Sequence, residues 1–137
     1  MAYAFGTSKG RLSACSQSYS GVNQSDTVDS KNTDNQTLGG TTYTQTTTVV
    51  ASNCWLICGE ANDSATPTAG TGLTTRSNGS GVDAQIMEGD SNATVGTGSQ
   101  SLVWNMGVGW KTSGTIMSIA PPVAVQTRSL LSILNAG

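Results

Sequence analysis

The sequence predicts an all-β protein, an antiparallel β-sandwich of about seven to nine short strands. Three observations support this fold class. Apolar clusters recur at intervals of about 10 to 15 residues, the spacing expected of strands separated by turns. The 137-residue chain contains 17 Gly and abundant Ser, Thr and Asn, which favour strands and tight turns. Helix-forming residues are sparse before the last dozen positions. A chain of this length fits one domain.

The first third of the chain is expected to hold three strands and one long connection. Residues 2–6 could form a short strand, and residues 11–20 a longer one. Residues 21–40 are polar and Gly-rich, which favours a connection, with local disorder around 24–40. Residues 41–50 are rich in Thr and Val, whose branched side chains disfavour a helix and favour a strand.

Residues 53–60 are apolar on both faces, which is typical of a central strand that is covered on each side. Cys54 and Cys58 lie on one face of this strand, with Cα atoms about 13 Å apart. That separation exceeds the limit of about 7 Å for a disulfide. Cys15 could pair with either thiol, but three buried, reduced cysteines are favoured. The three alone lack the fourth ligand of a zinc site.

The second half of the chain contains four further strand segments. Asn-Gly at 78–79 indicates a hairpin-like turn, and 89–92 a further turn. Pro121 and Pro122 end the last strand, because proline cannot donate to a β-ladder. The four segments are residues 73–76, 82–88, 101–106 and 115–120.

The C-terminal tail, residues 123–137, differs from the β-sandwich domain predicted for residues 1–122. Thr127 could cap a short amphipathic helix, and a donated strand is the alternative. The tail could pack on its own domain or dock on a neighbouring subunit. We expect its apolar residues to form an assembly interface: Val123, Val125, Leu130, Leu131, Ile133 and Leu134.

Composition argues against several functions. Charged residues are 10% of the chain and the net charge is -2, so nucleic acid is not expected as a partner. The absence of His removes the commonest catalytic base and metal ligand. No apolar stretch approaches the roughly 20 residues that span a membrane, and the N-terminus does not resemble a signal peptide. We expect no cofactor, no metal and no catalytic residues.

Two groups of residues are candidates for binding sites. Asp83, Glu88 and Asp90 lack the spacing of a calcium loop, so solvated carboxylates are expected. Trp55 and Trp104 lie in apolar runs and are expected in the core. Trp110, in a Gly-rich loop, is therefore the candidate for contacting a glycan, with Tyr43 as its companion.

Several segments together form a pattern that is shared with known modules: residues 19–24, the Thr-rich strand at 41–50, and residues 53–56, 69–76, 90–92 and 96–102. With this pattern, residues 11–120 resemble the β-sandwich modules of tailed-bacteriophage virion proteins and of repetitive bacterial surface proteins. Such modules carry additional strands before the segment corresponding to residues 11–22, so the resemblance implies either a smaller sandwich or an open sheet edge.

The sequence as a whole favours a non-enzymatic structural subunit of a virion, such as a capsid decoration, tail or fibre component. Its expected partners are copies of itself and other virion proteins, held through sheet-edge or tail contacts. The alternatives are a glycan-binding or adhesive module and a subunit of an extracellular filament. The expected location is the virion, after synthesis in the host cytoplasm, or alternatively the cell surface.

Overall fold

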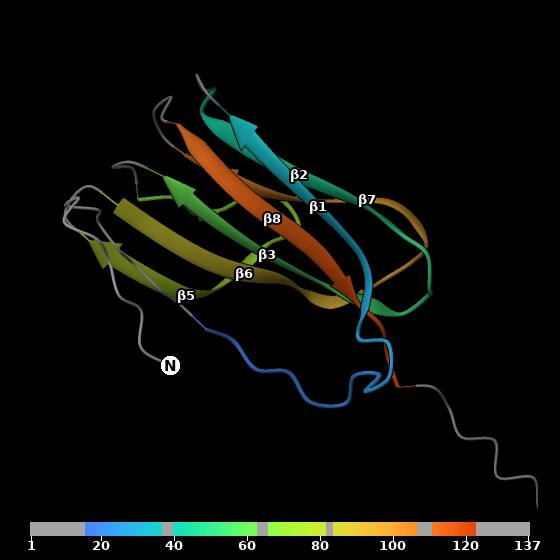
Figure 1. The fold of residues 1–137 in the computed structure, drawn as a ribbon. Coiled ribbons are helices and arrows are strands. Elements are labelled where there is room, and N and C mark those ends of the chain that lie inside the picture. The colour runs from blue at the N-terminus through green and yellow to red at the C-terminus, as the bar shows by residue number, and fades with distance from the viewer. Residues whose placement is uncertain (1–15, 37–39, 63–65, 82–83, 107–110, 123–137) are drawn as a thin grey trace, which may run out of the picture.

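The described part of the chain consists of strands and loops, without a helix (Figure 1). The computed structural model describes residues 16–36, 40–62, 66–81, 84–106 and 111–122. All strand pairs are antiparallel. The strands are β1 (Val28–Gln36), β2 (Thr42–Val49), β3 (Cys54–Asn62), β4 (Thr68–Ala69), β5 (Thr74–Gly81), β6 (Ala84–Val95), β7 (Gly98–Asn105) and β8 (Thr112–Ile119).

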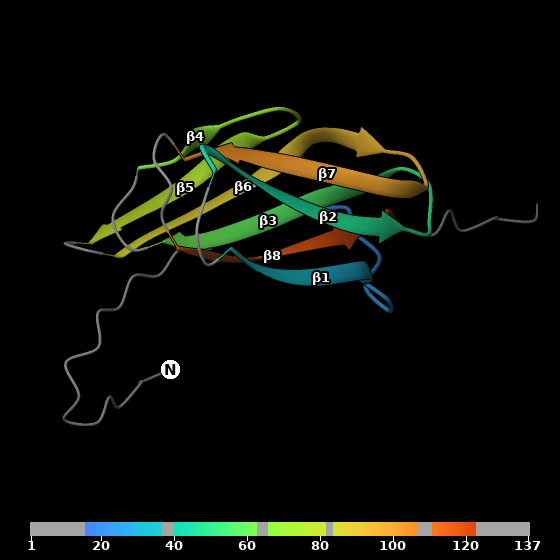
Figure 2. The same cartoon turned by 90° about the horizontal axis from the view of Figure 1, so that it is seen from above.

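The strands form two packed sheets, which confirms the predicted β-sandwich. One sheet has five strands in the order β1-β8-β3-β6-β5, and the other has three in the order β2-β7-β4. Figure 2 shows the two layers from above, with β2 and β7 over the larger sheet. β3 is the middle strand of the five-stranded sheet, as its apolar sequence predicts.

Alternation along the strands places the core between the two sheets. On β2 every second side chain from Tyr43 to Val49 is buried, and on β3 every second side chain from Cys54 to Asn62 is buried. The period of two follows from the pleat of a strand. The resulting core contains Tyr43, Val49, Cys54, Leu56, Cys58, Leu73, Met87, Leu102, Trp104, Met106, Ile116 and Ala120.

Polar side chains in this core are joined by hydrogen bonds. The Trp104 indole N–H donates to Gln45 Oε1 at 3.0 Å, and Gln45 Nε2 donates to the Gly59 carbonyl at 3.1 Å. Glu60 is 2% exposed, and Asn62 Nδ2 donates to its two carboxyl oxygens at 2.9 and 3.2 Å. Burial raises the pKa of Glu60 to about 7, although the Asn62 amide acts in the opposite direction.

Asp29 of β1 ties one edge of the larger sheet to the turn that follows β2. Its carboxylate accepts hydrogen bonds from the main-chain N–H groups of Val50 and Ala51, at 2.8 and 2.9 Å, and from the Ser118 hydroxyl at 2.9 Å. Burial raises the pKa of Asp29, but these bonds outweigh it and hold the pKa below its ordinary value.

The two cysteines in the described residues are buried and free, as the strand geometry predicts. Both belong to β3 and point into the core. Burial raises the pKa of Cys58 to about 12, so its thiol stays protonated at neutral pH. Cys15 lies outside the described residues, as do the predicted strand at residues 2–6, Asp83, Trp110 and the tail at 123–137.

Four predictions about strand positions are wrong. Residues 16–20 contain no strand, although residues 11–20 were expected to form one. β1 lies within the region predicted as a connection, because an edge strand paired on one side tolerates polar residues. β5 continues through the expected turn at 78–79. β6 runs through 89–92, where Asn92 has a φ of 50° and the register with β3 shifts, so the turn signal is a kink in a continuous strand.

Candidate binding site on the outer face of the five-stranded sheet

The side of the five-stranded sheet that faces away from the core is covered in part by residues 16–22. Register places Ile57 beside both Met117 and Asp90, and Trp55 beside Ile119, so these side chains share the outer face. The chain then turns into β1, where the Asn23 N–H donates to the Ala120 carbonyl at 3.0 Å.

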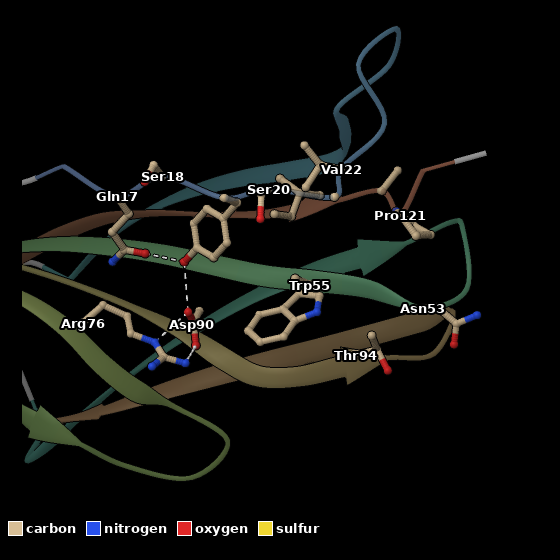
Figure 3. A pocket seen from close by; sticks show the side chains of 14 residues that line it. Gln17, Ser18, Ser20, Val22, Asn53, Trp55, Arg76, Asp90, Thr94 and Pro121 are labelled. Atoms are coloured by element: carbon tan, nitrogen blue, oxygen red, sulfur yellow. Dashed lines mark hydrogen bonds and ion pairs between the residues drawn. The ribbon is translucent and has the colours of Figure 1, made fainter. Parts of the chain in front are cut away.

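A cavity of about 690 Å³ lies between this crossing segment and the sheet (Figure 3). One wall is formed by residues 17–22, and the opposite wall by side chains of the central strands, including Trp55 and Asp90. Ile119 and Pro121, at the end of β8, close one end. Its volume falls within the range of about 300 to 1,000 Å³ typical of small-molecule sites.

An ion pair forms one end of the cavity. Arg76 Nε and Nη2 donate to the two Asp90 oxygens at 2.8 and 2.9 Å, which is a bidentate geometry. Asp90 also accepts the Asn92 main-chain N–H at 2.8 Å and the Tyr19 hydroxyl at 3.0 Å, and the same hydroxyl contacts Gln17 Oε1. Its side chain is 2% exposed, whereas that of Arg76 is 37% exposed.

The environment of this ion pair keeps it charged. Burial raises the pKa of Asp90, but the bonds from Arg76, Asn92 and Tyr19 together hold the pKa below its ordinary value. Burial, with the Asp90 carboxylate beside it, raises the pKa of Tyr19 well above its usual range. Tyr19 is therefore a neutral hydrogen-bond donor, and Asp90 is an anion with its acceptor positions occupied.

Two aromatic side chains meet in the cavity. The ring centroids of Tyr19 and Trp55 are 6.4 Å apart and their planes are inclined by 55°. This tilt makes a corner rather than a parallel stack, so neither ring covers the face of the other. Trp55 is only half-buried, in contrast to Trp104, which is completely buried in the core.

Polar side chains without partners lie at the opposite end from the ion pair. Asn53 and Thr94 are exposed and line the cavity. Within the described part of the chain, neither side chain makes a hydrogen bond. Asn53 has a φ of 61°, in the left-handed region that Asn tolerates better than most residues, and is the last turn residue before β3. Figure 3 shows both residues on the Trp55 side of the cavity.

Glu88 lies on the same outer face, two residues from Asp90, but borders a different cavity. That second space is about 320 Å³ and also contacts Gln17 and Tyr19. Burial raises the pKa of Glu88, although the nearby Gln17 amide acts in the opposite direction. Glu88 Oε2 has no hydrogen-bond partner among the described residues. Asp90 lines the first cavity and Glu88 lines the second, although Gln17 and Tyr19 border both. The carboxyl groups of Asp90 and Glu88 therefore do not face one shared substrate space, as a general acid and base would.

The structure corrects two expectations about site residues. Tyr43, expected as a companion in a glycan contact, is 2% exposed, and its hydroxyl donates to the Asp34 carbonyl at 2.8 Å. Asp90, expected to be a solvated carboxylate, is buried in an ion pair. Trp110 and the proposed interface Val123, Val125, Leu130, Leu131, Ile133 and Leu134 lie outside the described residues.

Sequence reasoning missed Trp55 as a surface aromatic because the strand around it is apolar on both faces. A strand covered on one side by a whole sheet and on the other by one extended segment has the same pattern as a fully buried strand. The one available signal was Tyr19, a single aromatic residue flanked by polar residues in the sequence Gln17-Ser18-Tyr19-Ser20. That pattern indicates a segment lying on a half-exposed surface.

No group of three or more potential metal ligands occurs among the described residues, and no membrane-spanning helix occurs there either. No protein-family model, curated protein or solved structure matches this chain.

Proposed function

We propose that this protein is a non-enzymatic structural subunit of a virion, a capsid decoration, tail or fibre component that assembles with its own copies through a sheet edge. The observation that carries the proposal is the incomplete pairing of β7. β2 pairs with β7 along its whole length, but β4 pairs only with Trp104 and Asn105. Figure 2 shows β4 beside one end of β7.

Along the part of β7 that β4 does not pair, the N–H and C=O groups of alternate residues point away from β2. The main-chain groups of Val103 point toward β4 and the loop after it: the Val103 N–H donates to the Thr71 carbonyl at 3.3 Å, and the Val103 carbonyl accepts the Gly70 N–H at 2.9 Å. Main-chain groups alternate in direction along an antiparallel strand, so those of Ser99 and Ser101 point the same way. The uncovered stretch, from Gly98 to Ser101, is about 14 Å long; Gly72 lies beside the Ser101 carbonyl at its end, and the remainder is free to pair with another strand.

The other edge strands carry features that oppose pairing. β1 presents Lys31 and Asp34, and such charges on an edge disfavour association. β5 carries Arg76 and an irregular register between Thr75 and Ser77. On β2, the Asn32 side chain of β1 already donates to the Thr46 carbonyl at 2.9 Å. The uncovered stretch of β7 carries no charged residue and no register shift in its pairing with β2.

The assignment to a virion is supported by the resemblance of residues 11–120 to phage β-sandwich modules. A low overall charge of -2 also suits a protein that packs closely against identical neighbours. The tail at residues 123–137 is a second candidate contact. A subunit of an extracellular filament would use the same edge, and differs only in the assembly that it joins.

The edge is tested by replacing Ser101 with proline. Proline removes an outward N–H, and an edge strand tolerates it where that N–H faces solvent. The matched control is Ser101→Ala, because both variants lose the hydrogen bond between the Ser101 and Thr46 hydroxyls, at 2.8 Å, but alanine keeps the N–H. Light scattering over a concentration series should show oligomers for the wild type and Ser101→Ala, and at least tenfold weaker association for Ser101→Pro.

A wild-type chain that stays monomeric at high concentration would refute the assembly proposal. An equal mass for Ser101→Pro and Ser101→Ala would exclude this edge, and deletion of residues 123–137 would then show whether the tail is the contact.

Detection of the chain by mass spectrometry in purified phage particles tests the virion assignment. Its presence only in cell-surface filaments would favour the alternative.

A further inference from the structure

We propose that the 690 Å³ cavity between residues 17–22 and the outer face of the sheet binds an uncharged sugar, with one pyranose ring packed on Trp55. This inference concerns the sheet face that is opposite to the core. It does not depend on the β7 edge or on assembly.

The aromatic wall suits a ligand with one apolar face. A pyranose presents C–H groups on one face of its ring, and these pack well against an aromatic surface. Trp55 is half-buried and borders the cavity, while Tyr19 stands at 55° to it, 6.4 Å between centroids. The two rings therefore form a floor and a side wall, which orients a flat ring better than a single aromatic would.

The free polar groups suit a ligand with hydroxyls around its edge. The Asn53 amide and the Thr94 hydroxyl have no partner within the described residues, and both lie near Trp55 (Figure 3). An amide offers donors and an acceptor, and a hydroxyl offers both as well. At the far end, Arg76 uses Nε and Nη2 for Asp90 and Asn92, and its Nη1 makes no hydrogen bond among the described residues.

The charges in the cavity favour an uncharged ligand. Arg76 and Asp90 neutralise one another, and the Asp90 carboxylate is saturated by three donor residues. The pair therefore fixes the end wall rather than attracting an ion. An extended peptide is also disfavoured, because most of the sheet under the cavity belongs to the internal strands β3, β6 and β8, and the edge strand β5 contributes only Arg76.

Binding is tested with the full chain and a panel of methyl glycosides of glucose, galactose, mannose and N-acetylglucosamine. Two-dimensional NMR of the ¹⁵N-labelled protein should show saturable shifts at Trp55, Tyr19 and Asn53. For a ligand of this size, the dissociation constant is expected on the order of 1 mM. Shifts that map to another face, or no saturation by any glycoside at about 50 mM, would overturn the proposal.

Two variants and one control locate the site. Trp55→Ala should weaken binding at least tenfold, by removal of the aromatic floor. Asn53→Gly should weaken it about fivefold, the effect of one lost hydrogen bond, and glycine keeps the φ of 61° without strain. Thr48→Ala, an exposed position on the smaller sheet, should leave binding unchanged.

Asn53→Gly decides the result if Trp55→Ala does not fold, because Asn53 is exposed and makes no hydrogen bond among the described residues. Unchanged affinity in a folded Trp55→Ala, or in Asn53→Gly if the first variant is unfolded, would overturn the assignment of this cavity. Loss of assembly without loss of sugar binding, or the reverse, distinguishes this site from the β7 edge.

Discussion

The buried carboxyl group of Glu60 should make the protein less stable as the pH rises from about 5 to about 7. Glu60 is 2% exposed, with the Asn62 amide as its donor, and burial raises its pKa from 4.5 to about 7. Between these two values the folded state holds a proton that the unfolded state has released. The unfolded state therefore binds fewer protons, and the free energy of unfolding falls as the pH rises.

The size of the effect follows from the shift. At about 1.4 kcal/mol per pKa unit, a change from 4.5 to about 7 corresponds to about 3 kcal/mol of stability present at pH 4.5 and lost above pH 7. For a chain of 137 residues this is a decrease in Tm of about 10 °C. The chain has no His, so no ordinary imidazole titration overlaps this interval.

The assay is urea denaturation at intervals from pH 4.5 to pH 8, with Glu60→Gln as the variant. Glutamine resembles the protonated glutamate and still presents an oxygen to Asn62. The free energy of unfolding of this variant should therefore change little with pH, apart from a smaller slope of the same sign from Glu88, whose pKa is also raised. A wild-type stability that is constant or rises between pH 5 and 7 would refute the reasoning.

Three further predictions concern stability and reactivity. Asp29→Asn should reduce the free energy of unfolding by about 2 kcal/mol in urea denaturation at pH 7, because one amide oxygen replaces a carboxylate that accepts three hydrogen bonds. In the wild type, the contribution of Asp29 to stability should be present above pH 4 and lost below it, since the pKa of Asp29 in the folded state is lowered from 3.8. Gly114→Ala should lower the free energy of unfolding by about 1–3 kcal/mol, because its Cβ would collide with Gln45 Nε2 and lie 2.5 Å from the Gly59 carbonyl oxygen. Gly96→Ala is the control and should cost far less, because nothing lies within 4 Å of its Cβ. Equal Tm values for the two variants would contradict this account. Cys58 is 1% exposed and has a pKa of about 12, so it should react with a thiol reagent at pH 8 only after denaturant is added. Peptide mapping locates the label. Rapid labelling of Cys58 in the native protein would show that β3 opens readily.

Much of the sandwich could be predicted from residue patterns. The central position of β3, the strand character of β2, β7 and β8, and the free state of the thiols on β3 follow from period-two alternation and strand length. Turn residues were less informative. Asn-Gly at 78–79 lies inside a strand, and 89–92 is a kink in β6, because pairing with neighbouring strands outweighed the local preference for a turn.

The candidate site could not be predicted in the same way. Tyr19, Trp55, Arg76 and Asp90 come from four separate segments, and no local pattern reports that they meet. Tyr43 and Trp55 illustrate the difficulty, since both are aromatic residues in strands. One faces the second sheet and is buried, while the other faces a single crossing segment and borders a cavity.

By itself, the amino-acid sequence determined that this chain forms strands rather than helices, which of its strands lies at the centre, and that its charge is low. These properties depend on local preference and on alternation, which are encoded residue by residue. The tertiary structure alone decided which face of each strand is covered, and by what. It placed Asp90 in an ion pair, left part of β7 unpaired on one side and formed an open cavity beside Trp55, because each of these depends on segments that are distant in the sequence and adjacent only after the sheets have packed.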